Sequence, residues 1–261
     1  WFWDFNNDGA LDLYVSSYVM KVGDVAADYL GLPVTAELDR LYQGDGKGGF
    51  REVSREQNLH RITQPMGSNF GDLDNDGFLD FYLGTGYPAY ESLMPNLMFR
   101  NRRGQGFSDV SKAGGFGHLQ KGHGVAFADL DHDGDQDVVL EVGGWLAGDA
   151  FGNALFENPG FGHHFVVLKL RGTRSNRAAM GAAIKLEIIE DGVRRSIHRW
   201  VGSGGSFAAS PLRQHIGVGD ATQIERTELY WPTTAHRPVS ADAAVDRVYD
   251  ITHGSGDLPP A

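Results

Sequence analysis

Short apolar runs alternate with polar, glycine-rich stretches over the first 160 residues of the chain. Leu13–Val15, Phe81–Leu83 and Val138–Leu140 are the clearest of these runs. Each is three residues long, is rich in aromatic or β-branched side chains, and is preceded by an Asp- and Gly-rich segment. Composition and punctuation of this kind are typical of strands joined by tight loops. The pattern therefore predicts a β-rich fold.

The segments before these runs are copies of one another. Residues 2–12, 70–80 and 127–137 share the pattern F-x-D-x-[DN]-x-D-G-x-x-D. A second repeated element covers residues 41–53 and 98–110, and a fainter third copy runs from residue 155 towards Phe165. Two hairpins per repeat predict a four-stranded sheet, the blade of a β-propeller. Residues 21–39 and 84–96 are predicted to be long insertions between strands.

The repeated Asp-rich loop suits a hard cation. Ca²⁺ takes six to eight oxygen ligands in a flexible shell, and the glycine at loop position 6 permits the sharp turn that gathers them. Positions 1, 3, 5 and 9 would supply side chains and position 7 a backbone carbonyl. The predicted ligands are Asp4, Asn6, Asp8, Ala10 and Asp12 in the first loop, Asp72, Asp74, Asp76, Phe78 and Asp80 in the second, and Asp129, Asp131, Asp133, Asp135 and Asp137 in the third.

Two other interpretations of the loops were weighed. An EF-hand needs a helix and an acidic residue at position 12, whereas this chain has Val15, Leu83 or Leu140 there, each within a predicted strand. An ion-free surface turn would cluster carboxylates at a Coulombic cost without a packing gain. We therefore expect about three Ca²⁺ ions, and Mg²⁺ is the less suitable ion because it demands octahedral geometry.

Net charge supports cation binding and argues against nucleic acid. The chain carries a formal charge of −11, which disfavours a polyanionic partner. Residues 163–261 contain 12 Lys and Arg and 10 Asp and Glu, so that their +2 leaves −13 on residues 1–162. Such an excess repels itself unless bound cations neutralise it. Cysteine is absent, which by itself does not decide between a cytosolic and a secreted setting. No apolar run is long enough to span a membrane, so we expect no membrane insertion.

The character of the chain changes near residue 160. We predict a domain of propeller repeats over residues 1–160 and a second domain over residues 161–261. Asp191-Gly192 between two apolar runs is a strong hairpin signal, and no 3.6-residue periodicity is present. The second domain is therefore predicted to be a small β-sandwich or barrel, with strands at 165–170, 183–190, 193–201, 214–218, 227–231 and 248–252.

The three loops resemble the FG-GAP/VCBS repeats of integrin α-subunit propellers and bacterial surface proteins. That resemblance covers roughly residues 1–160 and implies a seven-bladed propeller with cations on one face. Three loops in 160 residues make less than half of such a propeller. The resemblance is therefore to a partial or truncated set of blades, an arrangement that would leave strand edges unpaired.

The second domain resembles the ASPIC/UnbV family. The resemblance rests on residues 170–182, the Gly202–Ser210 segment, the His215-Ile-Gly-Val-Gly219 stretch and Trp231-Pro232. Thr233-Thr234 departs from the family, which usually has Ser-Gly there. The two domains together are similar to the cartilage acidic protein family and its bacterial relatives. This implies a calcium-binding protein that is secreted, displayed on the cell surface or periplasmic.

Function is predicted from this combination. We expect a recognition or adhesion module in which calcium is structural and the partner is a protein or a glycan. The alternatives are an accessory enzyme acting on glycans or a secondary metabolite, and a purely structural spacer. An enzyme would need a pocket where His118, His123 or Trp145 meets a free carboxylate. No nucleophile elbow, P-loop or dinucleotide motif is present, so enzymatic activity is the less favoured prediction and no catalytic residue is assigned.

One basic cluster suits a structural role. Arg194, Arg195 and Arg199 fall on the predicted strand 193–201, where the alternation of apolar and polar residues is blurred. Charged side chains often protect exposed sheet edges. The sequence therefore predicts an exposed, charge-guarded edge for this strand.

Overall fold

A computed structural model describes residues 1–18, 21–87, 94–144, 148, 151–234 and 237–254. The described residues form eighteen strands and one short helix, so the all-β prediction is confirmed. The elements in chain order are β1 (Phe2–Trp3), β2 (Asp12–Val15), α1 (Val22–Tyr29), β3 (Arg40–Gly44), β4 (Phe50–Glu52), β5 (Pro65–Gly71), β6 (Asp80–Thr85), β7 (Leu97–Asn101), β8 (Phe107–Asp109), β9 (Gly122–Ala128), β10 (Asp137–Val142), β11 (Ala154–Phe156), β12 (His164–Arg171), β13 (Ala183–Glu190), β14 (Val193–Trp200), β15 (Gln214–Gly219), β16 (Gln223–Tyr230), β17 (Arg237–Ala244) and β18 (Arg247–Thr252).

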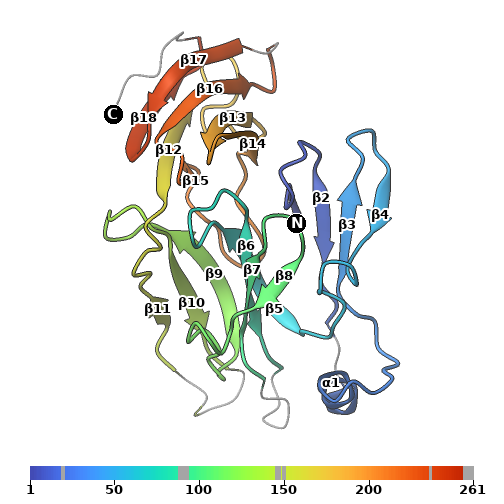
Figure 1. Ribbon diagram of the computed structural model, residues 1–261. Coiled ribbons are helices and arrows are strands. Elements are labelled where there is room, and N and C mark those ends of the chain that lie inside the picture. Colours follow the sequence, from blue (N-terminus) through green and yellow to red (C-terminus); the bar gives the residue numbers. More distant parts are fainter. Residues whose placement is uncertain (19–20, 88–93, 145–147, 149–150, 235–236, 255–261) are drawn as a thin grey trace.

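Three small antiparallel sheets make up the first part of the chain (Figure 1). The first two have the order β1-β2-β3-β4 and β5-β6-β7-β8, as expected for two hairpins per repeat. The third has three described strands, β11-β10-β9. The fainter third copy of the second repeated element, predicted to run from residue 155 towards Phe165, is wrong at its far end, because Phe165 belongs to β12, which pairs with β15 and β18 instead.

The blade-like sheets pack face to face, which explains why their strands are apolar on both sides. All six residues of β6 are buried. Phe81 and Leu83 join the cluster shared with the first sheet, whereas Tyr82 joins the cluster shared with the third. Successive strand residues point to opposite faces, so one strand contributes to two hydrophobic layers. A strand in the middle sheet is therefore apolar at consecutive positions, and not only at every second one.

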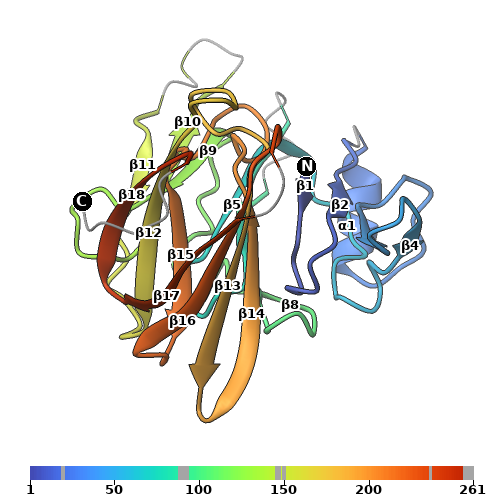
Figure 2. The ribbon, with the colours of Figure 1, turned by 90° about the horizontal axis from the view of Figure 1, so that it is seen from above.

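The second domain is a β-sandwich. Its sheets have the orders β15-β12-β18 and β14-β13-β16-β17, and they appear as two layers in Figure 2. One hydrophobic cluster joins them, with Val166 and Ile216 from the first sheet packed with Leu186 and Leu229 from the second. The alternating burial of β13 shows why the period-2 pattern predicted this fold.

The sequence missed two elements. Helix α1 lies within the insertion at residues 21–39 and has no buried residue. Strand β17 covers Arg237–Ala244 and pairs with β16. Its residues include a proline and several alanines, residue types that are depleted in strands. Among the described residues, no helix is long and apolar enough to cross a membrane.

Candidate cation loops at the domain junction

Each Asp-rich segment forms the loop between the first two strands of a sheet. We call them loop 1 (residues 4–12), loop 2 (residues 72–80) and loop 3 (residues 129–137). They connect β1 to β2, β5 to β6 and β9 to β10, and all three lie at the end of the blades that meets the second domain (Figure 1). The repeat therefore places three acidic loops side by side at one domain junction.

The three loops share a backbone conformation. Position 4 has a positive φ in each, with 57° at Asn7, 53° at Asn75 and 66° at His132. The glycine at position 6 also has a positive φ, between 86° and 99°. Asn is among the residues that tolerate this left-handed region, and glycine adopts it at no steric cost. The turn directs the side chains of neighbouring positions towards the inside of the loop.

The aspartate at position 9 fastens each loop to its sheet. One oxygen of Asp80 accepts the N–H of Leu73 (2.8 Å) and the other accepts the N–H of Asn101 (2.7 Å). Asp12 and Asp137 repeat both contacts at the corresponding positions of loops 1 and 3. These carboxylates thus have a backbone role that the sequence analysis did not assign. Their predicted part in an ion's shell stays a prediction.

Position 4 links each loop to the next. Asn7 Nδ2 donates to the Gly77 carbonyl of loop 2 (2.7 Å), and Asn75 Nδ2 donates to the Gly134 carbonyl of loop 3 (3.0 Å). These asparagines lie outside the predicted ligand positions, which are the odd-numbered ones. The presence of Asn at position 4 in two of the three copies was the available signal. The three loops consequently form one hydrogen-bonded row.

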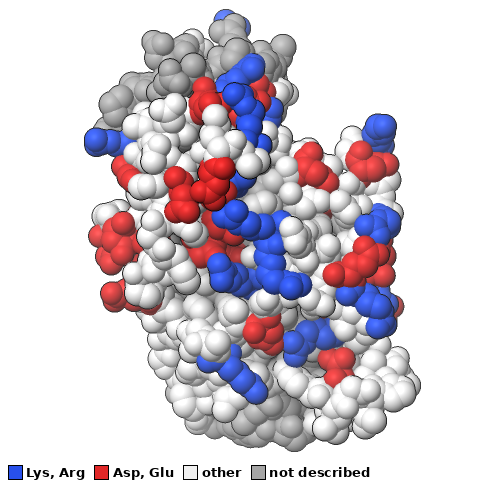
Figure 3. Space-filling model, viewed as in Figure 1, with Lys and Arg blue, Asp and Glu red and all other residues white. Residues whose placement is uncertain are grey.

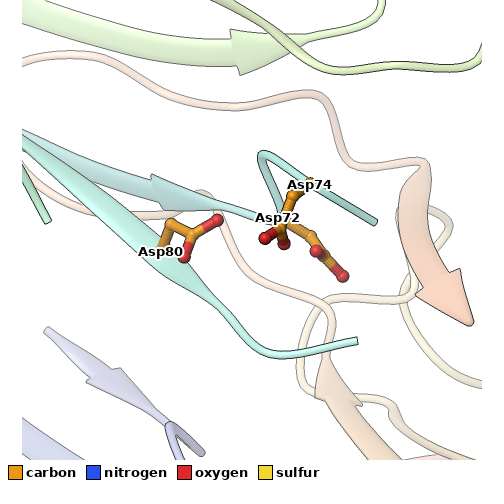
Figure 4. A group of neighbouring side chains, drawn as sticks. All are labelled: Asp72, Asp74 and Asp80. Carbon is orange, nitrogen blue, oxygen red and sulfur yellow. The ribbon is translucent and has the colours of Figure 1, made fainter. Parts of the chain in front are cut away.

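Loop 2 is buried and holds carboxylate oxygens without partners. Asp72, Asp74 and Asp80 are at most 1% exposed, and each offers an oxygen within 4.8 Å of the others (Figure 4). Oδ1 of Asp72 and Oδ1 of Asp74 are buried and accept no hydrogen bond. Buried polar atoms nearly always have partners, and an unsatisfied one calls for an explanation such as a bound ion. The donor set, hard oxygens from carboxylates, fits Ca²⁺.

Burial perturbs the acids of these loops. Burial and the neighbouring Asp76 raise the pKa of Asp72 to about 8. Burial likewise raises the pKa of Asp4 to about 7 and that of Asp12 to about 6. Desolvation and like charges disfavour the ionised form of a carboxyl group. A cation placed among these groups would reverse both effects.

Three arginines surround loop 2. Arg100 donates from Nε to Asp74 Oδ2 (2.6 Å), and Arg103 Nε lies 3.6 Å from Asp76 Oδ2. Arg199, on β14 of the second domain, places Nη2 3.4 Å from Asp72 Oδ2 and is only 4% exposed. Figure 3 shows basic and acidic side chains next to one another across the junction. The exposed-edge prediction is confirmed for Arg194, which is 61% exposed on the edge strand β14. It is wrong for Arg199, which is buried against loop 2, and for Arg195, which is half-buried and donates to the Asp76 carbonyl.

The glycine-rich stretch at residues 215–219 of the second domain also contacts loop 2. The N–H groups of Gly217 and Gly219 donate to Asp72 Oδ2 (3.2 Å) and to the Asn75 carbonyl (2.8 Å). His215 Nε2 donates to Asn75 Oδ1 (2.8 Å), and burial lowers the pKa of this histidine to about 3, which keeps it neutral. A Cβ at position 217 would overlap the Asn75 backbone. The His-x-Gly-x-Gly stretch therefore belongs to the interface between the domains.

Loops 1 and 3 are more open. Asp8, Asp131 and Asp133 are exposed, and in the part of the chain that the structure describes no lysine or arginine forms an ion pair with a carboxylate of either loop. Arg213 approaches loop 3 but donates to the backbone carbonyl of Asp129 (2.9 Å). Oδ1 of Asp129 is buried without a partner. Arg199 also lies near Asp4 of loop 1 and Arg213 near Asp129 of loop 3, but among the described residues neither loop has an arginine in direct contact with a carboxylate.

A cleft of about 410 Å³ opens beside the loops between the two domains. Phe2, Phe70 and Trp200 contribute aromatic side chains to its wall, and His198 and Arg213 contribute polar ones. His118 and His123 do not line it, and Trp145 lies outside the described residues. His118 Nδ1 instead accepts the Gln120 N–H (3.1 Å). The pocket required for the enzyme alternative is not assembled from these histidines.

Family models match one segment in each of the two parts of the chain. Residues 4–83 match the family described as FG-GAP-like repeat, and residues 172–258 match the family described as ASPIC and UnbV. Both resemblances drawn from the sequence are thereby confirmed.

Similar proteins carry the name cartilage acidic protein 1. The Mus musculus protein is 28% identical over 143 residues, which is 54% of this chain and 20% of the relative. The Homo sapiens protein is 27% identical over 143 residues with the same coverage, and the Xenopus tropicalis protein is 26% identical over 145 residues. The matched region thus spans 20% of the length of these curated relatives.

Proposed function

We propose that this chain is part of an extracellular recognition module whose acidic loops bind calcium as a structural ion. The observation that carries the proposal is the pair of buried, unpartnered oxygens in loop 2, Asp72 Oδ1 and Asp74 Oδ1. An uncompensated buried carboxylate is costly, whereas a divalent cation would bind both oxygens at once. The similarity to cartilage acidic protein 1 supports an extracellular setting.

Residues of each repeat would hold one ion. Asp72 and Asp74 would bind through their unpartnered oxygens, with Asp76 and the Phe78 carbonyl as further oxygen donors. Loops 1 and 3 offer the corresponding residues, and Asp129, Asp131 and Asp133 again bring their oxygens within 4.8 Å of one another. The ion neutralises groups that otherwise repel. Its role is to fix the loops and not to carry out a reaction.

Thermal unfolding tests the calcium half of the proposal. The protein is stripped with EGTA, and its melting temperature is measured before and after Ca²⁺ or Mg²⁺ is added. Saturation at about 100 times Kd contributes about 2.7 kcal/mol per site, so calcium is expected to raise the melting temperature by several degrees and magnesium by less. No shift with calcium would contradict the proposal.

A matched pair of variants assigns the shift to the loops. Asp133→Asn removes an exposed carboxylate from loop 3, and Asp250→Asn removes an exposed carboxylate from β18, away from the loops. The calcium-induced shift should shrink in the first variant and stay unchanged in the second. Equal shifts in both would show that calcium acts elsewhere on the molecule.

The second part of the proposal is the binding partner of the module. We propose that a protein or glycan binds to the surface that the loops hold in place, with the aromatic cleft at the domain junction as the seat for a glycan. Aromatic and polar side chains in one concave site are typical of small-ligand recognition. A glycan array probed in calcium and in EGTA tests this: calcium-dependent signals that Trp200→Ala abolishes are expected. An array that stays blank in both buffers would contradict the glycan version and leave a protein as the partner to seek.

A further inference from the structure

Loop 2 differs from loops 1 and 3 because arginine side chains from outside the loop contact its carboxylates. Arg100, Arg103 and Arg199 each lie within 4 Å of a different loop 2 carboxylate. The acid at loop position 9, Asp80, is satisfied by backbone N–H groups. Glu190 also pairs with Arg103 (3.1 Å) and with Arg195 (2.9 Å), whose Nη2 donates to the Asp76 carbonyl. Five acidic groups therefore face four guanidinium groups, and the surroundings of loop 2 are close to neutral without any ion.

The arginines and the orphan oxygens lie on opposite sides of the same carboxylates. Arg199 approaches Asp72 through Oδ2, and Arg100 binds Asp74 through Oδ2. The Oδ1 atoms of both aspartates are left without partners. An ion and the arginines can thus contact loop 2 together, but they repel each other across the carboxylates. At these short distances and deep burial, that repulsion is weakly screened.

We propose that Arg199 and the two blade arginines make loop 2 a charge-compensated, low-affinity cation site, while loop 3, whose Asp129, Asp131 and Asp133 form no ion pair among the described residues, binds its ion more tightly. This inference rests on the proposed calcium function and adds an order of occupancy to it. Arg199 reaches loop 2 only when the second domain is docked, because it projects from β14. Coupling between two binding events is reciprocal. If Arg199 lowers the affinity of loop 2 for an ion, an ion bound in loop 2 must lower the free energy of docking of the second domain by the same amount.

Calcium titration of the stripped protein by isothermal calorimetry tests the proposal. The wild type should show tight binding with a separate weak phase, and the weak phase should disappear in Asp74→Asn. In Arg199→Gln the weak site should tighten about tenfold, within the usual range for coupled sites. The matched control is Arg226→Gln, because Arg226 pairs with Glu228 in the same domain, away from the loops, and its titration should equal that of the wild type.

A second variant protects the test against misfolding. The Arg100 side chain is 45% exposed, so Arg100→Gln removes a loop 2 charge with little risk to the fold, and it too should tighten the weak site. An unchanged or lower affinity in both variants would overturn the proposal while leaving calcium binding itself intact. A wild type that binds no calcium would overturn this inference and the proposed function together.

Discussion

Loop 2 and loop 3 have the same sequence pattern and backbone turn but different surroundings. Loop 2 lies beneath the second domain, with its aspartates buried and three arginines against them. Loop 3 has exposed aspartates at positions 3 and 5 and no ion pair among the described residues. The repeat thus determines the shape of each loop, whereas Arg199 of the second domain and the blade residues Arg100 and Arg103 determine the charge around loop 2.

The pH dependence of the calcium-free protein is the largest expected effect. Burial raises the pKa of Asp72 to about 8 and that of Asp4 to about 7, above their values in the unfolded chain. The folded state therefore binds more protons, and stability falls as the pH rises from about 4 to 8. The loss should reach several kcal/mol, since one pKa unit corresponds to about 1.4 kcal/mol.

Urea unfolding in EGTA at pH 5 and pH 8 measures this loss, and calcium should abolish most of it. The exposed aspartates of loop 3 should add little to the slope. An identical free energy of unfolding at the two pH values would show that the buried acids are compensated in some other way.

Removing one aspartate from each loop sharpens the contrast. Asp72→Ala should destabilise the protein even without calcium, by about 1–3 kcal/mol for each group left unsatisfied, because Arg199 and the buried N–H groups of Gly77 and Gly217 lose their acceptor. Asp131→Ala should cost little in EGTA, since Asp131 is exposed, and should reduce only the stabilisation by calcium. Urea unfolding of both variants, with and without calcium, measures the difference. Equal costs in EGTA would remove the distinction between the loops.

The seat of the second domain on loop 2 is the next test. Gly217→Ala should cost about 1–3 kcal/mol, because its Cβ would overlap the backbone of Asn75. Gly202→Ala is the matched control in the same domain, because the only atom near its added Cβ lies 4.0 Å away. Differential scanning calorimetry should show a lower transition for the first variant alone. A Gly217→Ala variant with the transition temperature of the wild type would show that the interface accommodates the added Cβ without loss of stability.

The smallest expected effect concerns the row of loops. Asn7→Gly keeps the positive φ but removes the side-chain hydrogen bonds to Gly77 and His198. We expect a loss of about 1 kcal/mol, typical of one or two hydrogen bonds. Asn58→Gly is the matched control, since Asn58 also has a positive φ of 61° but lies outside the loops. Urea unfolding compares the two, and equal stability changes would show that the link between loops adds nothing.

Features that depend on neighbouring residues could be predicted from the sequence, whereas contacts between residues far apart in the sequence could not. The loops and most strands were readable because their signals repeat within about ten residues. Arg199 was assigned to an exposed edge because a strand shows its own alternation but not what packs against it. Its partner, Asp72, lies 127 positions away. Strand β17 was missed because its proline and alanines are weak strand formers, and its pairing with β16 determines it instead.

The central claim, that the acidic loops hold calcium, is tested most directly by a crystal structure of the protein grown with calcium. The account predicts one ion in each of the three loops, with carboxylate oxygens at about 2.3–2.6 Å. In loop 2 the bound atoms should include Oδ1 of Asp72 and Oδ1 of Asp74. Anomalous scattering would identify the ions. Ordered loops without ions at millimolar calcium would contradict the account.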